Sequence, residues 1–182
     1  MGCQPKMDVA MQTVKAGNAF SIDLPKNFTP TENLHDFAAL QYADDEAGYY
    51  LIGLVENKAE MAEMHLHYSL SDYAWFVERK VSESLDTSDV QRMGRMLNAG
   101  LECETTEFFA TKATLDGPMD VWFRISVVES STHFYQLIAW TPRGQDQEFH
   151  DAFEQMECSF SELDANGEQI SQPGGAESSI GS

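Results

Sequence analysis

The stretch that most constrains this chain is residues 120–141, DVWFRISVVESSTHFYQLIAWT. Two apolar runs, residues 121–128 and 133–140, flank a short polar turn at residues 129–132. Both runs are rich in β-branched and aromatic residues, which suit the pleated surface of a sheet, so the pattern predicts a β-hairpin. Apolar side chains occur on both faces of both strands. The sequence therefore predicts a sheet that other elements cover, at least in part, on both sides.

The remaining periodic segments predict further strands and two helices. A helix is expected over residues 71–85, where apolar residues recur at helical spacing and Ser71 is placed to cap the first turn. A second helix is expected over residues 146–157, whereas residues 86–100 predict no element. Strands are predicted over residues 20–24, 37–42, 49–55 and 108–115. This order predicts an α+β fold in which an antiparallel sheet is sandwiched between helices in three layers.

The length and the ends of the chain predict one domain with two extensions. At 182 residues the chain fits a single domain of ordinary size. Residues 1–19 are polar and predict a flexible tether, residues 20–163 contain all the periodic segments, and residues 164–182 predict a disordered tail. The sequence thus predicts one folded domain over residues 20–163.

Charge and composition argue against a nucleic-acid partner and against a disulfide-rich fold. Eleven Lys and Arg residues against thirty Asp and Glu residues give a formal net charge of −19. Such a surface repels phosphate backbones and anionic lipids, which argues against a nucleic-acid partner. Three cysteines are too few for a disulfide framework. Cys103 and Cys158 either pair in an oxidising compartment or remain as buried thiols.

The start of the sequence, Met1-Gly2-Cys3, precedes a polar segment and resembles the mature start of a bacterial lipoprotein. In such proteins the cysteine carries the lipid, and we expect Met1 to stand in place of a removed signal peptide. This interpretation places the domain in the cell envelope, with Cys3 as the lipid anchor and its only membrane contact. Eukaryotic myristoylation at Gly2 is disfavoured by Lys6, because that motif requires Ser or Thr there. An ordinary start with an incidental cysteine is the other alternative, and it would leave the protein cytoplasmic.

The best candidate for a metal site is the group Glu63, His65 and His67. The alternation of these residues with apolar ones predicts an edge strand, on which all three would share a face. Imidazole and carboxylate groups are ligands for Zn²⁺, so a divalent metal is the one cofactor considered. No fourth ligand is evident. Two solvent-facing histidines on an edge strand are the simpler interpretation.

No catalytic arrangement is recognisable in the sequence. It contains no Gly-x-Ser-x-Gly motif, phosphate-binding glycine loop or dinucleotide fingerprint. We therefore predict a protein that is not an enzyme, with a small metal-binding protein or enzyme using His65 and His67 as the alternative. Trp75 and Phe76 lie away from the apolar stripe of the first helix and are candidate interface residues. A contact of Trp75 with Leu70, as in a hydrophobic staple, is the structural alternative.

The order of elements resembles the Mog1/PsbP-like superfamily, and in particular bacterial lipoproteins of the DcrB type. The residues that carry the likeness are Asn98-Ala-Gly100, the run FYQLIAWT at residues 134–141, Phe149, Phe153 and Ser159-Phe160. The resemblance implies a three-layer α/β/α sandwich that acts as a binding or accessory module for an unidentified protein or small ligand. The superfamily shares no catalytic residues, so none is carried over. Its members bind a small GTPase, photosystem subunits or unidentified envelope components, and likeness of fold does not transfer such a function.

Overall fold

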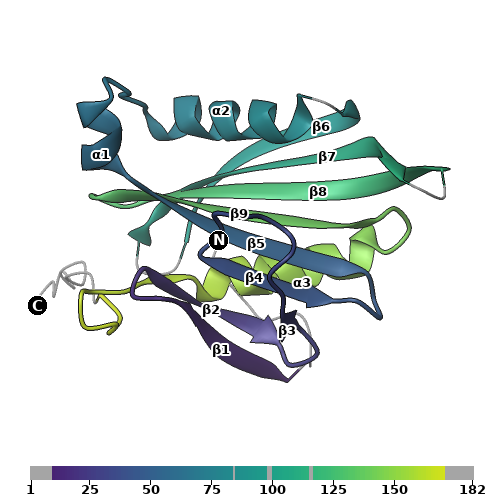
Figure 1. Cartoon of the computed structure of the whole chain (residues 1–182), viewed down its shortest axis with the longest axis horizontal. Coiled ribbons are helices and arrows are strands. Elements are labelled where there is room, and N and C mark those ends of the chain that lie inside the picture. Colours follow the sequence, from purple (N-terminus) through teal and green to yellow (C-terminus); the bar gives the residue numbers. More distant parts are fainter. Residues whose placement is uncertain (1–9, 84, 98–99, 115–116, 171–182) are drawn as a thin grey trace, which may run out of the picture.

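A seven-stranded antiparallel sheet forms the centre of the computed structural model, which describes residues 10–83, 85–97, 100–114 and 117–170 (Figure 1). Its strand order is β3-β4-β5-β9-β8-β7-β6. The strands in chain order are β3 (Thr29–Pro30), β4 (Leu40–Asp44), β5 (Tyr49–Asn57), β6 (Asp86–Met96), β7 (Glu102–Thr114), β8 (Gly117–Glu129) and β9 (His133–Pro142). The predicted β-hairpin is therefore confirmed as β8 and β9, and both strands are longer than the apolar runs from which they are predicted.

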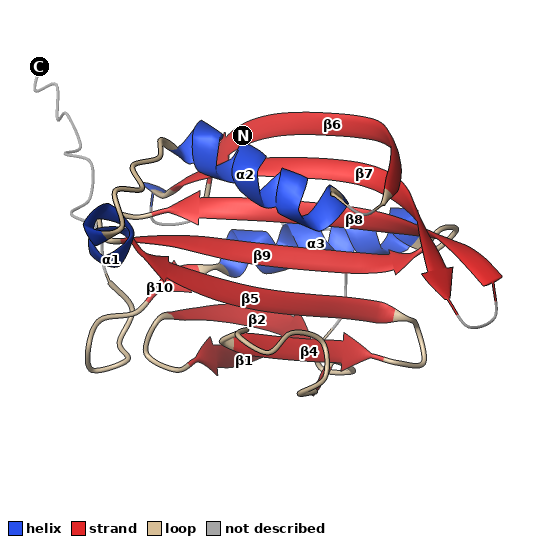
Figure 2. Cartoon of the chain, turned by 45° about the horizontal axis from the view of Figure 1, so that its top comes forward, coloured by secondary structure: helices blue, strands red, loops and turns tan. Residues whose placement is uncertain are grey.

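Different elements cover the two faces of this sheet (Figures 1 and 2). One face carries α2 (Leu70–Ser82), which follows the short helix α1 (Lys58–Glu63). The other face carries α3 (Asp146–Ser159) together with a small sheet of order β1-β2-β10. The strands of the small sheet are β1 (Met11–Ala16), β2 (Phe20–Pro25) and β10 (Ser161–Glu162). The predicted antiparallel sheet between helical layers is correct, with a three-stranded sheet added to the α3 layer.

The β8–β9 hairpin separates two hydrophobic cores. Phe123 and Ile125 pair with Trp140 and Ile138 across the hairpin and join the core under α2. The alternate side chains, such as Trp122, join the core against α3 and the small sheet. This confirms the prediction that the sheet is covered on both sides. Trp140 is only partly buried, because it lies at the end of the α2 core, stacked on Phe123 with ring centroids 6.3 Å apart.

Helix α2 begins at Leu70 and is capped by Ser69, not by Ser71 as predicted. The Ser69 hydroxyl accepts a hydrogen bond from the Asp72 amide at 3.2 Å, and the Asp72 carboxylate accepts one from that hydroxyl. Ser71 instead lies in the first turn and donates to Glu104. Both serines satisfy the sequence rule for a cap, so only the backbone decides between them.

The ends of the domain extend beyond the predicted boundaries. Strand β1 lies within the predicted tether and pairs with β2 over its whole length, with Val14 and Ala16 buried. The expectation of a tether is wrong for this segment, because β1 is stabilised by its neighbour rather than by its own weak pattern. Residues 164–170 likewise form a turn in which the Asp164 carboxylate accepts the amides of Asn166 and Glu168. Residues 17–19 of the predicted tether form the turn between β1 and β2, whereas residues 1–9 and 171–182 lie outside the described residues.

Strand β6 is another element that the sequence did not predict. It pairs with β7 alone and forms one edge of the large sheet, with a bulge between Ser88 and Gln91. Most of its side chains are exposed, so it lacks the apolar alternation from which strands are predicted.

Among the described residues, no helix is long and apolar enough to cross a bilayer.

Candidate functional site

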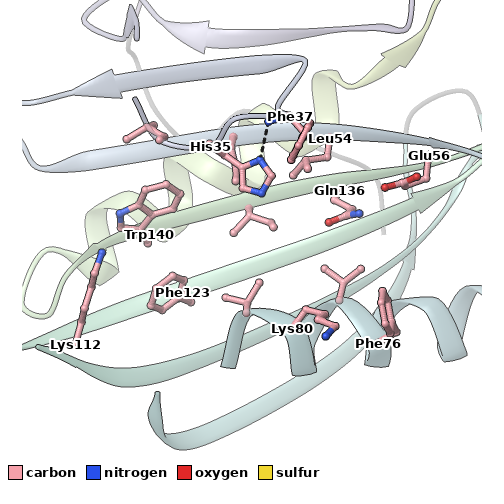
Figure 3. A pocket seen from close by; sticks show the side chains of 15 residues that line it. His35, Phe37, Leu54, Glu56, Phe76, Lys80, Lys112, Phe123, Gln136 and Trp140 are labelled. Carbon is pink, nitrogen blue, oxygen red and sulfur yellow. Dashed lines mark hydrogen bonds between the residues drawn. The ribbon is translucent and has the colours of Figure 1, made fainter. Parts of the chain in front are cut away.

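A groove of about 570 Å³ lies on the α2 face of the large sheet, between α2 and residues 34–37 (Figure 3). We call it the α2 groove. Side chains from β5, β8 and β9 form its floor, and α2 forms one wall. Its lining residues are Leu34, His35, Phe37, Ile52, Leu54, Glu56, Phe76, Val77, Lys80, Val81, Lys112, Phe123, Gln136, Ile138 and Trp140. The groove exists because α2 packs on β7 and β8 and leaves the β5 side of this face open.

The side chain of Gln41 on β4 holds the second wall in place. Its carbonyl oxygen accepts the amides of Leu34 and His35, each at 2.9 Å, and its amide group donates to the His35 carbonyl at 2.9 Å. These three bonds fix a segment that has no ladder partner of its own. The wall is therefore a positioned feature of the fold.

Phe37 projects from this wall with 85% of its surface exposed, which is the largest exposure of any large apolar residue in the described part of the chain. Its amide donates to Nδ1 of His35 at 3.2 Å, the dashed bond of Figure 3. The two rings meet edge to face, with centroids 6.2 Å apart. An aromatic ring held at the rim of an apolar groove is typical of a binding surface.

The charged residues of the groove lie at separate places. Lys112 lies beside Trp140 at one end, Lys80 lies on α2, and Glu56 lies at the other end (Figure 3). Lys80 forms an exposed ion pair with Glu83 at 3.5 Å, and its ammonium lies 5.9 Å from the centroid of the Phe76 ring. Within the described residues, no carboxylate lies at ion-pair distance from Lys112. The pKa of Glu56 is raised, first by burial and then by the charge of Glu60.

A second polar cluster connects β8 to α3 on the opposite face of the sheet. Arg124 and Glu157 are both fully buried there and form a bidentate ion pair. Arg124 also donates to Glu107, which lies 3.3 Å from Nε2 of His150. The carboxylates of this cluster face cations and a serine hydroxyl, so the arrangement fastens α3 to the sheet rather than presenting an open site.

The pKa values of two residues in this cluster, His150 and Glu107, depend on each other. The hydrogen bond with Glu107 raises the pKa of His150. Burial alone would raise the pKa of Glu107, but the hydrogen bond with His150 and the positive charge of Arg124 outweigh burial and lower it. This coupling could not be predicted from the sequence, because Glu107 and His150 lie far apart in the chain and are brought together only by the fold.

The predicted metal group is not supported by the structure. Glu63 ends α1, His65 has a left-handed backbone with φ of 61°, and the following residues form no strand. The expected edge strand is absent, so its shared face is absent as well. Asn57 caps α1 by accepting the amides of Ala59 and Glu60, and the chain turns where α1 ends, because the Leu66 amide donates to the Met61 carbonyl at 2.9 Å. The segment therefore turns back on α1 where alternation favoured a strand. Glu63, His65 and His67 are exposed and are not brought together as a ligand set.

Metal-ligating atoms do approach one another elsewhere, at His150, Asp151 and Glu154 on α3. Arg124 lies 3.2 Å from Nε2 of His150 and 4.0 Å from the Glu154 carboxylate. A guanidinium group already supplies the positive charge there, which disfavours a cation at the same point.

The two candidate interface residues face different surroundings. Phe76 lines the α2 groove, where it stacks on Tyr68 with centroids 5.8 Å apart. Trp75 lies outside the groove, 54% exposed, with the Arg79 guanidinium 5.0 Å from its ring centroid. Only Phe76 therefore belongs to the groove, and Trp75 extends the exposed aromatic surface on the outer side of α2.

Cysteine pairing is settled for one residue. Cys103 is a free thiol, 1% exposed, so the pairing of Cys103 with Cys158 is excluded. Burial raises the pKa of the Cys103 thiol. Cys3, the predicted lipid anchor, lies outside the described residues.

Comparison with known proteins identifies the fold. No family model matches the sequence, and no curated protein matches it. The solved structure of the PsbP protein of Synechocystis sp. PCC 6803 has a TM-score of 0.59 and 11% identity, and it covers 90% of this chain and 98% of that one. The fold is Mog1/PsbP-like.

Two further structures extend this likeness. The Ran-binding protein Mog1p of Saccharomyces cerevisiae has a TM-score of 0.59 and 12% identity, covering 88% of this chain and 99% of that one. LpqN of Mycobacterium tuberculosis, a protein involved in cell envelope biogenesis, has a TM-score of 0.52 and 10% identity, covering 87% and 93%. At such identities the likeness shows a Mog1/PsbP-like fold, and the α2 groove must be interpreted from its own residues.

Apart from Phe76, the residues of the α2 groove are not predicted as a site by the sequence. Phe37, Leu54, Phe123 and Trp140 all lie in segments that predict strands. The only signal in the sequence is an aromatic residue within the polar stretch TENLHDF at residues 31–37. Exposed aromatic residues are enriched where proteins contact other molecules, which makes Phe37 a candidate contact residue.

Proposed function

We propose that this chain is a cell-envelope lipoprotein whose single domain is a non-catalytic binding domain, and that the α2 groove is its binding site. The observation that carries the proposal is the exposed Phe37 ring at the rim of a groove with an apolar floor. A volume of about 570 Å³ lies within the range of about 300–1,000 Å³ typical of ligand sites. The groove has aromatic side chains on both walls, which are the side chains enriched in recognition surfaces.

The fold neighbours support a binding role. Mog1p is a Ran-binding protein, and LpqN is involved in cell envelope biogenesis. Neither of these descriptions names a reaction. The α2 groove itself contains no nucleophile beside a base, and its one histidine, His35, uses Nδ1 to accept the Phe37 amide.

The anchor at Cys3 is the second part of the proposal. Strand β1 begins at Met11, so only a short segment, residues 4–10, separates Cys3 from the first strand of the domain. The strongly acidic domain would be repelled by anionic headgroups at that range. In this proposal the lipid on Cys3 holds the protein at the membrane, and the folded domain binds the other molecule.

The binding role is tested by recovery of the protein from its own cells after Phe37→Ser, with Met96→Ser as a control. Met96 is an exposed apolar residue on the β6 edge, outside the α2 groove. We expect a bound molecule that co-purifies with the wild type and with the Met96 variant to be lost from the Phe37 variant. Equal recovery with all three proteins would overturn the assignment of the groove.

The anchor is tested by fractionation of cells that express the natural gene with Cys3→Ser. We expect the variant to leave the membrane fraction with an unchanged melting temperature. Peptide mapping without reducing agent provides an independent check. A disulfide between Cys3 and Cys158 would contradict the anchor, because an acylated sulfur cannot form a disulfide.

A further inference from the structure

We infer that the occupant of the α2 groove is a single-chain amphiphile with an anionic headgroup, such as a fatty-acid carboxylate. Its chain would lie on the sheet floor and its headgroup would lie beside Lys112, with Lys80 on α2 adding positive charge to the groove. This inference rests on the proposed function, because it names the ligand of the same groove. It follows from the hydrogen-bonding, the size and the charge of the groove.

The floor of the groove offers no hydrogen bonds to a peptide backbone. Strands β5, β8 and β9 are interior strands, each paired on both sides within the sheet, so their backbone groups are already satisfied. The amide group of Gln136 on this floor donates to the Tyr73 hydroxyl at 2.7 Å. An extended peptide would therefore bury unpaired polar groups, whereas an acyl chain has none to bury.

The size of the groove argues against a helix as its occupant. An α-helix with side chains is about 10–12 Å across with a rise of 1.5 Å per residue, so it fills at least about 120 Å³ per residue. A groove of about 570 Å³ would hold little more than one turn. An unbranched acyl chain is thin enough to lie entirely within a groove of this volume.

The charges of the groove select the headgroup. This chain has only eleven Lys and Arg residues in 182, and two of them line the groove. Most of the other basic residues in the described part of the chain form ion pairs, among them Lys58 with Glu129 at 2.5 Å. Lys112 lies at the end beside Trp140, while Glu56 lies at the opposite end (Figure 3). Charge complementarity therefore places an anionic headgroup at the Lys112 end and directs the chain over Ile138 and Leu54 toward Glu56.

The experiment is a titration of the full chain, in a Trp75→Phe background, with dodecanoate below its micellar concentration. Trp140 fluorescence reports occupancy, since Trp122 is buried on the other face of the sheet. Neutral dodecyl maltoside and cationic dodecyltrimethylammonium carry the same chain length and are the headgroup controls. We expect dodecanoate to bind at least tenfold more tightly than the cationic amphiphile. From octanoate to dodecanoate, we expect Kd to fall about fourfold for each added CH₂ that the groove buries.

Three variants locate the bound amphiphile. We expect Lys112→Gln and Lys80→Gln each to weaken dodecanoate binding about two- to fivefold, and to leave dodecyl maltoside unaffected. Lys26→Gln removes an exposed lysine outside the groove and should change neither. Leu54→Trp, with its fold checked by circular dichroism, should fill the groove floor and abolish binding. Unchanged affinity in Leu54→Trp would overturn the inference, because the amphiphile would then bind elsewhere.

The remaining outcomes separate this inference from the proposed function. Equal binding of all three headgroups would overturn the anionic ligand and leave the groove as a binding site. If no amphiphile binds below about 1 mM while Phe37→Ser still releases a partner protein, the occupant is a protein and the amphiphile is wrong. If neither binds, both the inference and the proposed function fail.

Discussion

Arg124 on β8 and Glu157 on α3 form a bidentate ion pair with no exposed surface on either side chain. Arg124 Nε lies 3.1 Å from Glu157 Oε1, and Arg124 Nη2 lies 2.8 Å from Glu157 Oε2. Ser126 also donates to Glu157, so the carboxylate is held from two positions on β8. Buried ions are tolerated when they are paired and hydrogen-bonded in this way.

We expect loss of one partner to destabilise the domain strongly. Arg124→Met leaves Glu157 with one fewer cation in the core, and should lower the free energy of unfolding by about 3–5 kcal/mol. The double variant Arg124→Met/Glu157→Leu should lose less than the sum of the two single changes. Urea unfolding measures all three. Arg143→Gln is the control, because its pair with Asp120 at 3.9 Å is exposed and should contribute about 0–1 kcal/mol. Equal losses for Arg124 and Arg143 would contradict the account.

The neighbouring contact between His150 and Glu107 makes part of this stability depend on pH. The raised pKa of His150 means that its contribution is complete below its ordinary pKa of 6.5 and is lost as pH rises through the folded-state value. The lowered pKa of Glu107 means that its contribution is present above the ordinary value of 4.5 and is lost as pH falls through the folded-state value.

The difference in melting temperature between the wild type and His150→Asn should therefore be largest between about pH 4.5 and 6.5. Thermal unfolding across pH 3–9 measures it, with His35→Asn as the control, because His35 lies on the groove rim away from these carboxylates. A difference that grows steadily above pH 7 would show that the sign is wrong.

Gly53 on β5 lies directly against the Phe20 ring of the small sheet. A Cβ atom at this position would lie 2.7 Å from Cζ of Phe20, whose ring is fully buried. Gly53→Ala should therefore cost about 1–3 kcal/mol through forced repacking. Gly94→Ala on β6 is the matched control, since a Cβ there has no neighbour within 4 Å. A Gly53 variant as stable as the Gly94 variant would mean that Phe20 packs differently.

Cys103 should be unreactive in the native protein. Its thiol is buried and its pKa is raised by that burial, so little reactive thiolate forms at neutral pH. Maleimide labelling followed by mass spectrometry should modify Cys103 only after denaturation. Modification at the same rate before and after denaturation would contradict its placement in the core.

The sequence predicted the centre of the fold because that part is governed by local pattern. The alternation along β8 and β9 separates Phe123 from Trp122 by a rule of period two, which holds wherever both faces are covered. Strand β1 and strand β6 could not be predicted in this way. One depends on β2, and the other is an exposed edge whose pairing with β7 leaves little trace in its composition.

The candidate site was predicted less well than the fold. Phe76 was identified as an interface residue, but the α2 groove depends on where α2 ends relative to β5 and on a loop held by Gln41. The predicted metal group failed because α1, capped by Asn57, ends at Glu63 in a turn with a left-handed residue at His65, so no strand follows. In each case a tertiary contact or a cap overrides the periodicity on which the prediction depends.

The central claim is that the α2 groove binds another molecule. Photo-cross-linking in living cells tests it directly, with p-benzoylphenylalanine placed at Phe37 in one strain and at Met96 in another. Both positions are exposed and apolar, but only Phe37 lies at the groove. The account predicts a discrete cross-linked species from position 37 that Leu54→Trp removes, and none from position 96. No adduct at position 37, or the same adduct from both positions, would contradict it.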